Sequence, residues 1–205
     1  MRNISPTKAA LLTAKRSRDF AQTGASLLEK KQSILALELT AYLNQAHRLR
    51  EQMEALFHEA RESLQKAQIV LGQSDKWASS ITPDDGLTLH YRSVMGIHLP
   101  IVTARDAPPT LSYALTDTDS TLDEAFLRFT KLKTLLHNLA QAEGSVHRLD
   151  QAIRKTGKRV NALKRAVIPR FDRDIRQIEE VLALREQEGF IRQKGMKKRR
   201  FTSFV

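Results

Sequence analysis

Gly157 and Lys158 are the first residues whose types suggest chemistry, because a Gly-Lys pair occurs in phosphate-binding loops. Such a loop needs another glycine five residues before Gly157, and the sequence has Ala152 there. It also needs a preceding β-strand, whereas the apolar residues around this pair recur at helical spacing. The pair therefore does not predict a nucleotide site.

The histidines lack the spacing of metal ligands. The six are His47, His58, His90, His98, His137 and His147. None stands four residues from another and none belongs to an H-E-x-x-H helix, so the ligand spacing of a zinc site is absent. The sequence has no cysteine, which excludes disulfides, thiolate catalysis and cysteine zinc sites. We expect no catalytic residue, no metal and no cofactor.

Positive charge is the remaining chemical feature, with 34 Lys and Arg against 23 Asp and Glu and a net charge of +11. Residues 72–124 hold eight acidic and three basic residues, so the two flanks are more basic than the whole chain. The cluster RQKGMKKRR (192–200) could meet nucleic acid, anionic lipid or an acidic protein cavity. It lacks the interleaved aromatic residues of single-strand binders. Simple solvated helix faces are the other interpretation of this charge.

A first long helix is expected from Ser5-Pro6, which would supply a cap and the first helical position, to Gly72, which would end it at a positive φ. Its apolar residues step by about four and three, the spacing of a heptad seam. The predicted seam consists of Leu28, Leu35, Tyr42, Ala46, Leu49, Met53, Leu56, Ala60, Leu64 and Ala67. Further upstream the stripe has the small residues Ala14, Ser17, Ala21 and Gly24, which either pack closely or fray.

A second long helix is expected from about Thr121, where Thr121-x-x-Glu124 has the pattern of a capping box. Its predicted seam consists of Leu139, Ala142, Val146, Leu149, Ile153, Thr156, Val160, Leu163, Val167, Phe171, Ile175, Ile178 and Leu182. Steps of four run from Leu163 to Ile175, and such a stutter unwinds a left-handed supercoil. Pro169 lies inside the stutter, so we expect the helix to straighten or bend at 165–169.

The segment between the helices has a different pattern. TPDDG (82–86) is typical of a turn, and APPT (107–110) of an extended linker. Between them residues 87–102 alternate in hydrophobicity, with Leu87, Leu89 and Tyr91 in one set and Met95, Ile97, Leu99 and Ile101 in another. This alternation predicts a small β-hairpin with its bend at 92–96. Trp77 is expected to pack within the same segment.

These elements predict an all-α fold, a long antiparallel two-helix coiled coil with a small middle region that contains a short β-hairpin. The expected division is 1–72 for the N-terminal helix, 73–120 for the middle region, and 121–205 for the C-terminal helix and basic tail. Each helix of about 60–75 residues would be roughly 90–110 Å long at 1.5 Å per residue. Both termini would lie at one end. A lone hairpin is marginally stable, so something is expected to cover the other end.

No apolar run approaches the roughly 20 residues that span a bilayer. The N-terminal residues have only short apolar pieces and do not have the pattern of a secretory signal. We therefore expect a soluble, cytoplasmic protein that reaches a membrane only through partners.

Several stretches resemble one protein family. They are SPTKAALLTAKR (5–16), SVMGIHLP (93–100), KRVNALKRAVIPRF (158–171), IEEVL (178–182) and REQEGFIRQKGMKKR (185–199). In this order, and over nearly the whole chain, they resemble the D subunit of the V-type and archaeal A-type ATPases. The block from Arg159 to Arg170 is the most specific. One departure is Lys164, at a position where family members often have an acidic residue.

The resemblance implies a central rotor shaft that carries torque while its neighbours hydrolyse or make ATP. The implied partners are the catalytic hexamer of A and B subunits, the small F subunit of the stalk, and the membrane ring through its connecting subunit, with no nucleic acid. The positions implied for contact with the hexamer are Lys158, Arg159, Asn161, Lys164, Arg165, Pro169, Arg170, Lys197, Lys198, Arg199 and Arg200. Those implied for the small stalk partner or the ring side are Tyr91, Val94, Met95, Gly96, Ile97, Leu99 and Pro100.

A bend at Pro169 would make such a shaft asymmetric, so that rotation presents different faces to three otherwise equivalent catalytic sites. A kink that only accommodates local packing is the simpler interpretation. Two other functions fit the same pattern. One is a coiled-coil scaffold or tether that does not turn, and the other, less favoured, is a nucleic-acid-binding coiled coil that uses its basic arms.

Overall fold

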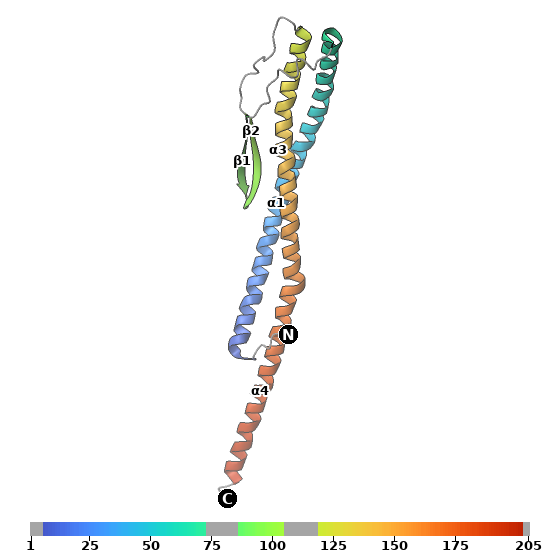
Figure 1. Ribbon diagram of the computed structural model, residues 1–205. Helices are drawn as coiled ribbons and strands as arrows, with labels where there is room; N and C mark the ends of the chain where they lie inside the picture. The colour runs from blue at the N-terminus through green and yellow to red at the C-terminus, as the bar shows by residue number, and fades with distance from the viewer. Residues whose placement is uncertain (1–5, 73–85, 105–118, 203–205) are drawn as a thin grey trace. The chain divides into compact units, whose positions relative to one another are not determined.

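The computed structural model describes residues 6–72, 86–104 and 119–202. Its elements are helix α1 (Lys8–Leu71), strands β1 (Leu87–Val94) and β2 (Ile97–Ala104), helix α3 (Ser120–Ala162), the π-helical turn η2 (Leu163–Val167) and helix α4 (Ile168–Thr202) (Figure 1). The predicted fold class is confirmed, since two long helical segments flank a short antiparallel hairpin along the chain. The predicted turn at 82–86 lies outside the described residues except for its last residue, and the linker at 107–110 and Trp77 lie wholly outside them.

The chain forms two compact units, and each contains parts of both long helical segments. The terminal unit consists of Met1–Gln32 and Arg154–Val205, and the middle unit consists of Ser33–Ile153. The hairpin belongs to the middle unit, whereas η2 and α4 belong to the terminal unit.

Helix α1 begins two residues later than the sequence predicts, at Lys8 instead of Pro6. The Thr7 hydroxyl accepts a hydrogen bond from the Ala10 N–H at 3.1 Å, which makes Thr7 the N-cap. Pro6 therefore precedes the cap, and its predicted place at the first helical position is wrong. The predicted end is confirmed, because Gly72 has a φ of 73° and its N–H donates to the Gln68 carbonyl at 3.0 Å.

The capping box predicted for the second helical segment is also wrong. The cap is Asp119, whose carboxylate accepts from the Ser120 N–H at 2.8 Å and whose carbonyl accepts from the Leu122 N–H at 2.9 Å. The Glu124 carboxylate turns instead to Arg128, one turn along the helix, at 2.6 Å. The Thr121 hydroxyl oxygen is buried with no partner in the described part of the chain. Because Asp119 already supplies the acceptor, the helix starts before Thr121.

Both predicted seams are buried or half-buried in the structure. Between residues 41 and 70 the positions of α1 that are not exposed are the predicted ones together with Ser63, which the sequence pattern did not single out. All predicted seam positions from Leu139 to Leu182 are likewise buried or half-buried. Ala21 and Ala25 are buried as well, so the small-residue part of α1 packs closely.

Contacts between the helices show that they run antiparallel within each unit. In the terminal unit, Lys8 pairs with Glu186 at 3.1 Å and Lys15 pairs with Glu179 at 2.7 Å, so one residue number falls as the other rises. In the middle unit, Arg50 pairs with Glu143, and the Arg128 guanidinium donates to the Glu59 carbonyl at 3.1 Å. The order of these partners gives the antiparallel arrangement that the sequence predicts.

The hairpin has the two-residue turn that favours a right-handed twist. β1 and β2 pair in continuous register from Leu87 opposite Ala104 to Val94 opposite Ile97. Met95 and Gly96 form the turn with φ values of 51° and 77°, as a type I′ turn requires. The predicted bend at 92–96 is confirmed.

Strand β2 of the hairpin packs on the helices of the middle unit, with Leu99 on one face and Pro100 on the other. Leu99 is fully buried with Leu35 of α1 and Leu149 of α3. Gly144 of α3 permits a close approach, since a Cβ atom there would lie 3.2 Å from the Pro100 ring. The two predicted alternating sets therefore differ in environment, because Leu87, Leu89 and Tyr91 are exposed.

Candidate partner-binding surfaces

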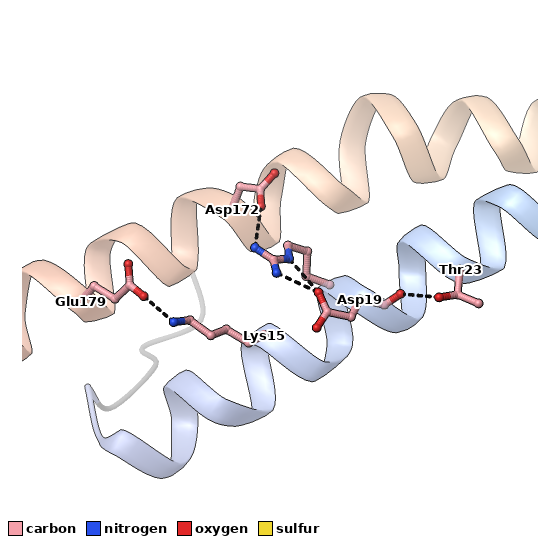
Figure 2. A network of polar contacts seen from close by, with 6 residues as sticks. Lys15, Asp19, Thr23, Asp172 and Glu179 are labelled. Atoms are coloured by element: carbon pink, nitrogen blue, oxygen red, sulfur yellow. Dashed lines mark hydrogen bonds and ion pairs between the residues drawn. The ribbon is translucent and has the colours of Figure 1, made fainter.

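Charged side chains fix the alignment of the two helices of the terminal unit (Figure 2). Lys15 of α1 pairs with Glu179 of α4, and Arg18 contacts both Asp19 at 2.8 Å and Asp172 of α4 at 3.9 Å. The hydrogen bond and the charge of Asp19 raise the pKa of Arg18 above its ordinary value. Exposed ion pairs add little net stability. These contacts therefore chiefly select one register, and the buried apolar seam holds the helices together.

The π-helical turn η2 explains how the helix accommodates Pro169. The Ile168 N–H donates to the Leu163 carbonyl, five residues back, so this turn holds one more residue than an α-helical turn. The extra residue keeps Val167 on the seam despite the four-residue steps, and Val167 is half-buried. The wider turn at Leu163–Val167 overlaps the range 165–169, where the sequence predicts that the helix straightens or bends, and the straightening or bend itself stays a prediction. The wider turn was not predicted.

Exposed cations surround η2. All seven positions implied for the hexamer in this part of the chain are exposed, namely Lys158, Arg159, Asn161, Lys164, Arg165, Pro169 and Arg170. Lys164 pairs with Glu29 of α1, and Arg170 approaches Asp174 at 4.0 Å. Within the described residues, Lys158, Arg159 and Arg165 have no ion-pair partner. These three cations are therefore the ones that remain available to an acidic partner.

The last part of α4 has no helix beside it in the described part of the terminal unit. The final cross-helix contacts are the pair of Lys8 with Glu186 and the hydrogen bond from Arg185 to the Pro6 carbonyl at 2.8 Å. From residue 183 to Lys197 every position is exposed. Lys198, Arg199 and Arg200 belong to the same helix. The basic cluster predicted from the sequence is thus carried on an unpaired helix.

The same stretch of α4 exposes large apolar side chains that sequence analysis did not assign to a partner. Leu184 is 59% exposed, Phe190 67%, Ile191 68% and Met196 63%. Exposed apolar side chains that stand singly are normal on a protein surface, whereas adjacent ones such as Phe190 and Ile191 favour a binding segment. The signal available in the sequence was the Phe190-Ile191 pair within a strongly polar stretch.

The seven hairpin positions implied for a partner do not share one environment. Tyr91, Met95 and Gly96 are exposed, and Val94, Ile97 and Pro100 are half-buried. Leu99 is buried in the core of the middle unit, so it anchors the hairpin and is not available to a partner. This placement corrects its assignment to the surface.

The exposed tip of the hairpin has an unusual residue. Met95 adopts a positive φ, which is uncommon outside glycine, Asn and Asp, and its side chain is 48% exposed. An apolar residue that accepts this backbone cost at an exposed turn favours a binding role over a structural one. Behind the tip, the Arg148 guanidinium lies 5.1 Å from the centre of the Tyr91 ring and donates to the His98 carbonyl at 3.0 Å.

Candidate metal sites and membrane-spanning helices are both absent from the described ranges. No group of three or more His, Cys, Asp or Glu side chains there is arranged to hold a metal ion. None of the helices within those ranges combines the length and the hydrophobicity needed to cross a membrane.

Comparison with known proteins then identifies the family. The family model described as that of the ATP synthase D subunit matches residues 10–198. This chain belongs to the ATP synthase D-subunit family. The resemblance inferred from the sequence stretches is thereby confirmed.

Individual members of the ATP synthase D-subunit family match over nearly their whole length. The V-type ATP synthase D subunit of Thermotoga neapolitana is 33% identical, with 96% of this chain and 98% of the relative covered. The A-type ATP synthase D subunit of Pyrococcus horikoshii is 34% identical, with 95% and 93% covered. That of Methanopyrus kandleri is 30% identical, with 96% and 87% covered.

Proposed function

We propose that this chain is the central rotor shaft of a V/A-type rotary ATPase. In this role it transmits torque between the catalytic hexamer of A and B subunits and the membrane ring that translocates ions. The observation that carries the proposal is the near-full-length similarity to proteins named as the D subunits of V-type and A-type ATP synthases. The chain itself is then non-catalytic, needs no cofactor, binds no nucleic acid, and lies on the cytoplasmic side, peripheral to the membrane through the complex.

A shaft transmits torque through stiffness, and the helix packing supports this role. Small residues lie buried on the facing helices of the middle unit, with Ala60, Ser63 and Ala67 on α1 and Ala142 and Ser145 on α3. Small side chains let helix axes approach closely, which gives a tightly packed rod. Ion pairs across the helices of the terminal unit hold their register.

The terminal unit is the part that we propose to enter the hexamer. Its outer face at η2 carries Lys158, Arg159 and Arg165, which have no ion-pair partner within the described residues. Cations spread over a surface attract an acidic inner surface of the hexamer without fixing one tightly bound position, which suits a rotating contact. The end of α4 that has no helix beside it in the described residues, with its exposed Phe190 and Ile191, supplies an apolar contact to the same inner surface of the hexamer. The basic cluster at 197–200 adds charge there.

The middle unit is the part that we propose to face the small F subunit of the stalk and the connecting subunit of the ring. The hairpin tip supports this assignment, because Tyr91, Met95 and Gly96 are exposed and Met95 has a strained backbone. Leu99 serves as the anchor that holds this surface on the helices.

Co-expression of the tagged chain with the A, B and F subunits of the same organism tests the proposal. We expect one complex that hydrolyses ATP and rotates, with this chain present once per catalytic hexamer. A free coiled-coil tether would purify without the hexamer. A nucleic-acid binder would instead show a salt-dependent affinity for generic DNA with a slope of several phosphates.

A charge-neutralising set tests the assigned contact face. The triple variant Lys158→Gln, Arg159→Gln, Arg165→Gln should weaken retention of the chain in the hexamer at least tenfold at low salt. The matched control Arg48→Gln, Arg61→Gln, Lys66→Gln removes equal charge from exposed positions of the middle unit and should leave retention unchanged. Equal losses in both sets would refute the assignment of the η2 face.

A further inference from the structure

The two edges of the hairpin differ in how their backbone groups are satisfied. On β2, the Val102 N–H donates to the Gln141 side chain of α3 at 2.9 Å, and the His98 carbonyl accepts from Arg148 of α3 at 3.0 Å. Pro100 lies between them and has no N–H to offer. Side chains of α3 thus satisfy these two groups on the free edge of β2, the strand that lies nearer to α3 in Figure 1.

Within the described residues the edge of β1 is open, and the register identifies its groups. The Val102 N–H points away from β1, so its partner across the ladder, Leu89, points its own N–H and carbonyl away from β2. The direction alternates along an antiparallel strand, so Leu87, Tyr91 and Ser93 point the same way. None of these backbone groups has a hydrogen-bond partner among residues 6–72, 86–104 and 119–202.

The side chains of β1 give this edge an apolar face. Leu87, Leu89 and Tyr91 lie on one face of the hairpin and are 48%, 53% and 52% exposed. Proteins usually protect a free strand edge with charged side chains, above all lysine, with a proline or with a β-bulge. β1 has the sequence LTLHYRSV, in which Arg92 is the one Lys or Arg and no proline occurs. Strand β1 pairs with β2 in continuous register without a bulge.

From this asymmetry we propose that β1 binds an extended segment of another stalk subunit by β-strand addition. Backbone hydrogen bonds to Leu87, Leu89, Tyr91 and Ser93 supply the attachment, and the apolar face selects a segment with alternating apolar side chains. The occupant is a strand because the open groups are regularly spaced backbone donors and acceptors, which only another extended backbone matches. This inference rests on the proposed function, since it states how the middle unit holds its neighbour.

Hydrogen exchange in the assembled complex tests the proposal directly. The amides of Leu87, Leu89 and Tyr91 should exchange at least tenfold more slowly in the purified complex than in the isolated chain. The amides of His90 and Arg92, which point toward β2, are bonded in both states and serve as the internal reference. The comparison uses the wild-type chain, so it does not depend on any variant folding.

A pair of substitutions at one position separates backbone from side chain. Leu89→Pro removes an outward N–H without removing a ladder bond, and proline is tolerated at such edge positions. Leu89→Thr removes the same apolar side chain but keeps the N–H. We expect Leu89→Pro to weaken binding of the stalk neighbour at least tenfold and Leu89→Thr to retain most of it. Protection of His90 and Arg92 in the isolated Leu89→Pro chain verifies that the hairpin is intact.

The outcomes are distinguishable. A chain that enters the complex but shows unchanged exchange at Leu87, Leu89 and Tyr91 overturns strand addition and leaves the proposed function standing. A chain that never assembles with the A and B subunits overturns both. Slow exchange of these amides in the isolated chain, dependent on its concentration, would identify a second copy as the occupant and overturn the proposal for a neighbour in the stalk.

Discussion

Replacing the π-turn by a regular α-helix tests why Pro169 lies inside this helix. Deletion of Ala166 removes one residue from η2 at an exposed position, so no packed side chain is lost. The step from Leu163 to the next seam residue then shortens from four to three, which is ordinary heptad spacing. The deletion is made alone and together with Pro169→Ala, and Pro169→Ala is made by itself.

The structure gives the expected energies. A proline in a regular helix costs about 3 kcal/mol, because its ring meets the carbonyl four residues back and one hydrogen bond is lost. In the native chain the wider turn, with its bond from Ile168 to Leu163, relieves this clash. The deletion alone should therefore destabilise the terminal unit by about 3 kcal/mol. The double variant should return to within about 1 kcal/mol of the native chain, and Pro169→Ala alone should change little because the extra residue remains.

Urea unfolding followed by circular dichroism, with hydrogen exchange to localise the change to the terminal unit, measures this cycle. A coupling energy of about 3 kcal/mol between the deletion and Pro169→Ala is expected. If the deletion alone is no more harmful than the double variant, the π-turn does not exist to accommodate Pro169, and the reasoning fails. In assembled complexes the double variant separates the two interpretations of the turn. Altered coupling of ATP hydrolysis to rotation supports the interpretation of an asymmetric shaft. Unaltered coupling supports the interpretation that the turn only accommodates local packing.

Three further predictions follow from the hairpin and the tail. Leu99→Ala should lower the hydrogen-exchange protection of β1 and β2 by about 30-fold or more, because burial of this leucine contributes about 2–5 kcal/mol to stability. The control Leu89→Ala, at an exposed position, should have little effect on this protection. Met95→Asn should raise hairpin protection about fivefold, because Asn accepts a positive φ at a cost lower by about 1 kcal/mol, yet it should weaken assembly with the stalk neighbour. Replacing Lys197, Lys198, Arg199 and Arg200 by Gln should weaken binding to the hexamer more at low salt than at high salt, because salt screens the attraction of the native cations. Equal losses of affinity at low and at high salt would exclude a charge contact.

The sequence predicted the seams of both helices because hydrophobic periodicity reports directly which face is covered. It missed Ser63, which is buried because the helices are close there and whose hydroxyl bonds to the Ala60 carbonyl at 2.8 Å. It assigned the wrong cap to both helices, because several residues near each start were able to cap and only geometry selects one. Thr7 and Asp119 became the caps because their oxygens reach free backbone N–H groups.

The sequence was less informative about which surface residues are available to partners. It could not predict that Lys164 pairs with Glu29, since the two are far apart along the chain and meet only when the helices align. It assigned Leu99 to a partner, whereas the hairpin folds that side chain into the core. A hydrophobic strand of alternating residues has two faces, and composition alone did not say which face meets the helices.

Stiffness and assembly make different demands on the two surfaces of these helices. The facing surface needs small and apolar residues in one register, and the buried Ala25, Ala60 and Ser145 meet this need. The outer surface needs cohesion with a partner yet freedom to move past it, which a deep apolar pocket would not permit. Cations without ion-pair partners in the described part of the chain, such as Arg159 and Arg165, satisfy that requirement because the energy of charge attraction changes only slowly with distance.

The edge of β1, open within the described residues, is the opposite case, since backbone hydrogen bonds demand one fixed geometry. On the proposed function, the hairpin therefore fixes a neighbour that turns with the shaft, and the η2 face meets one that does not.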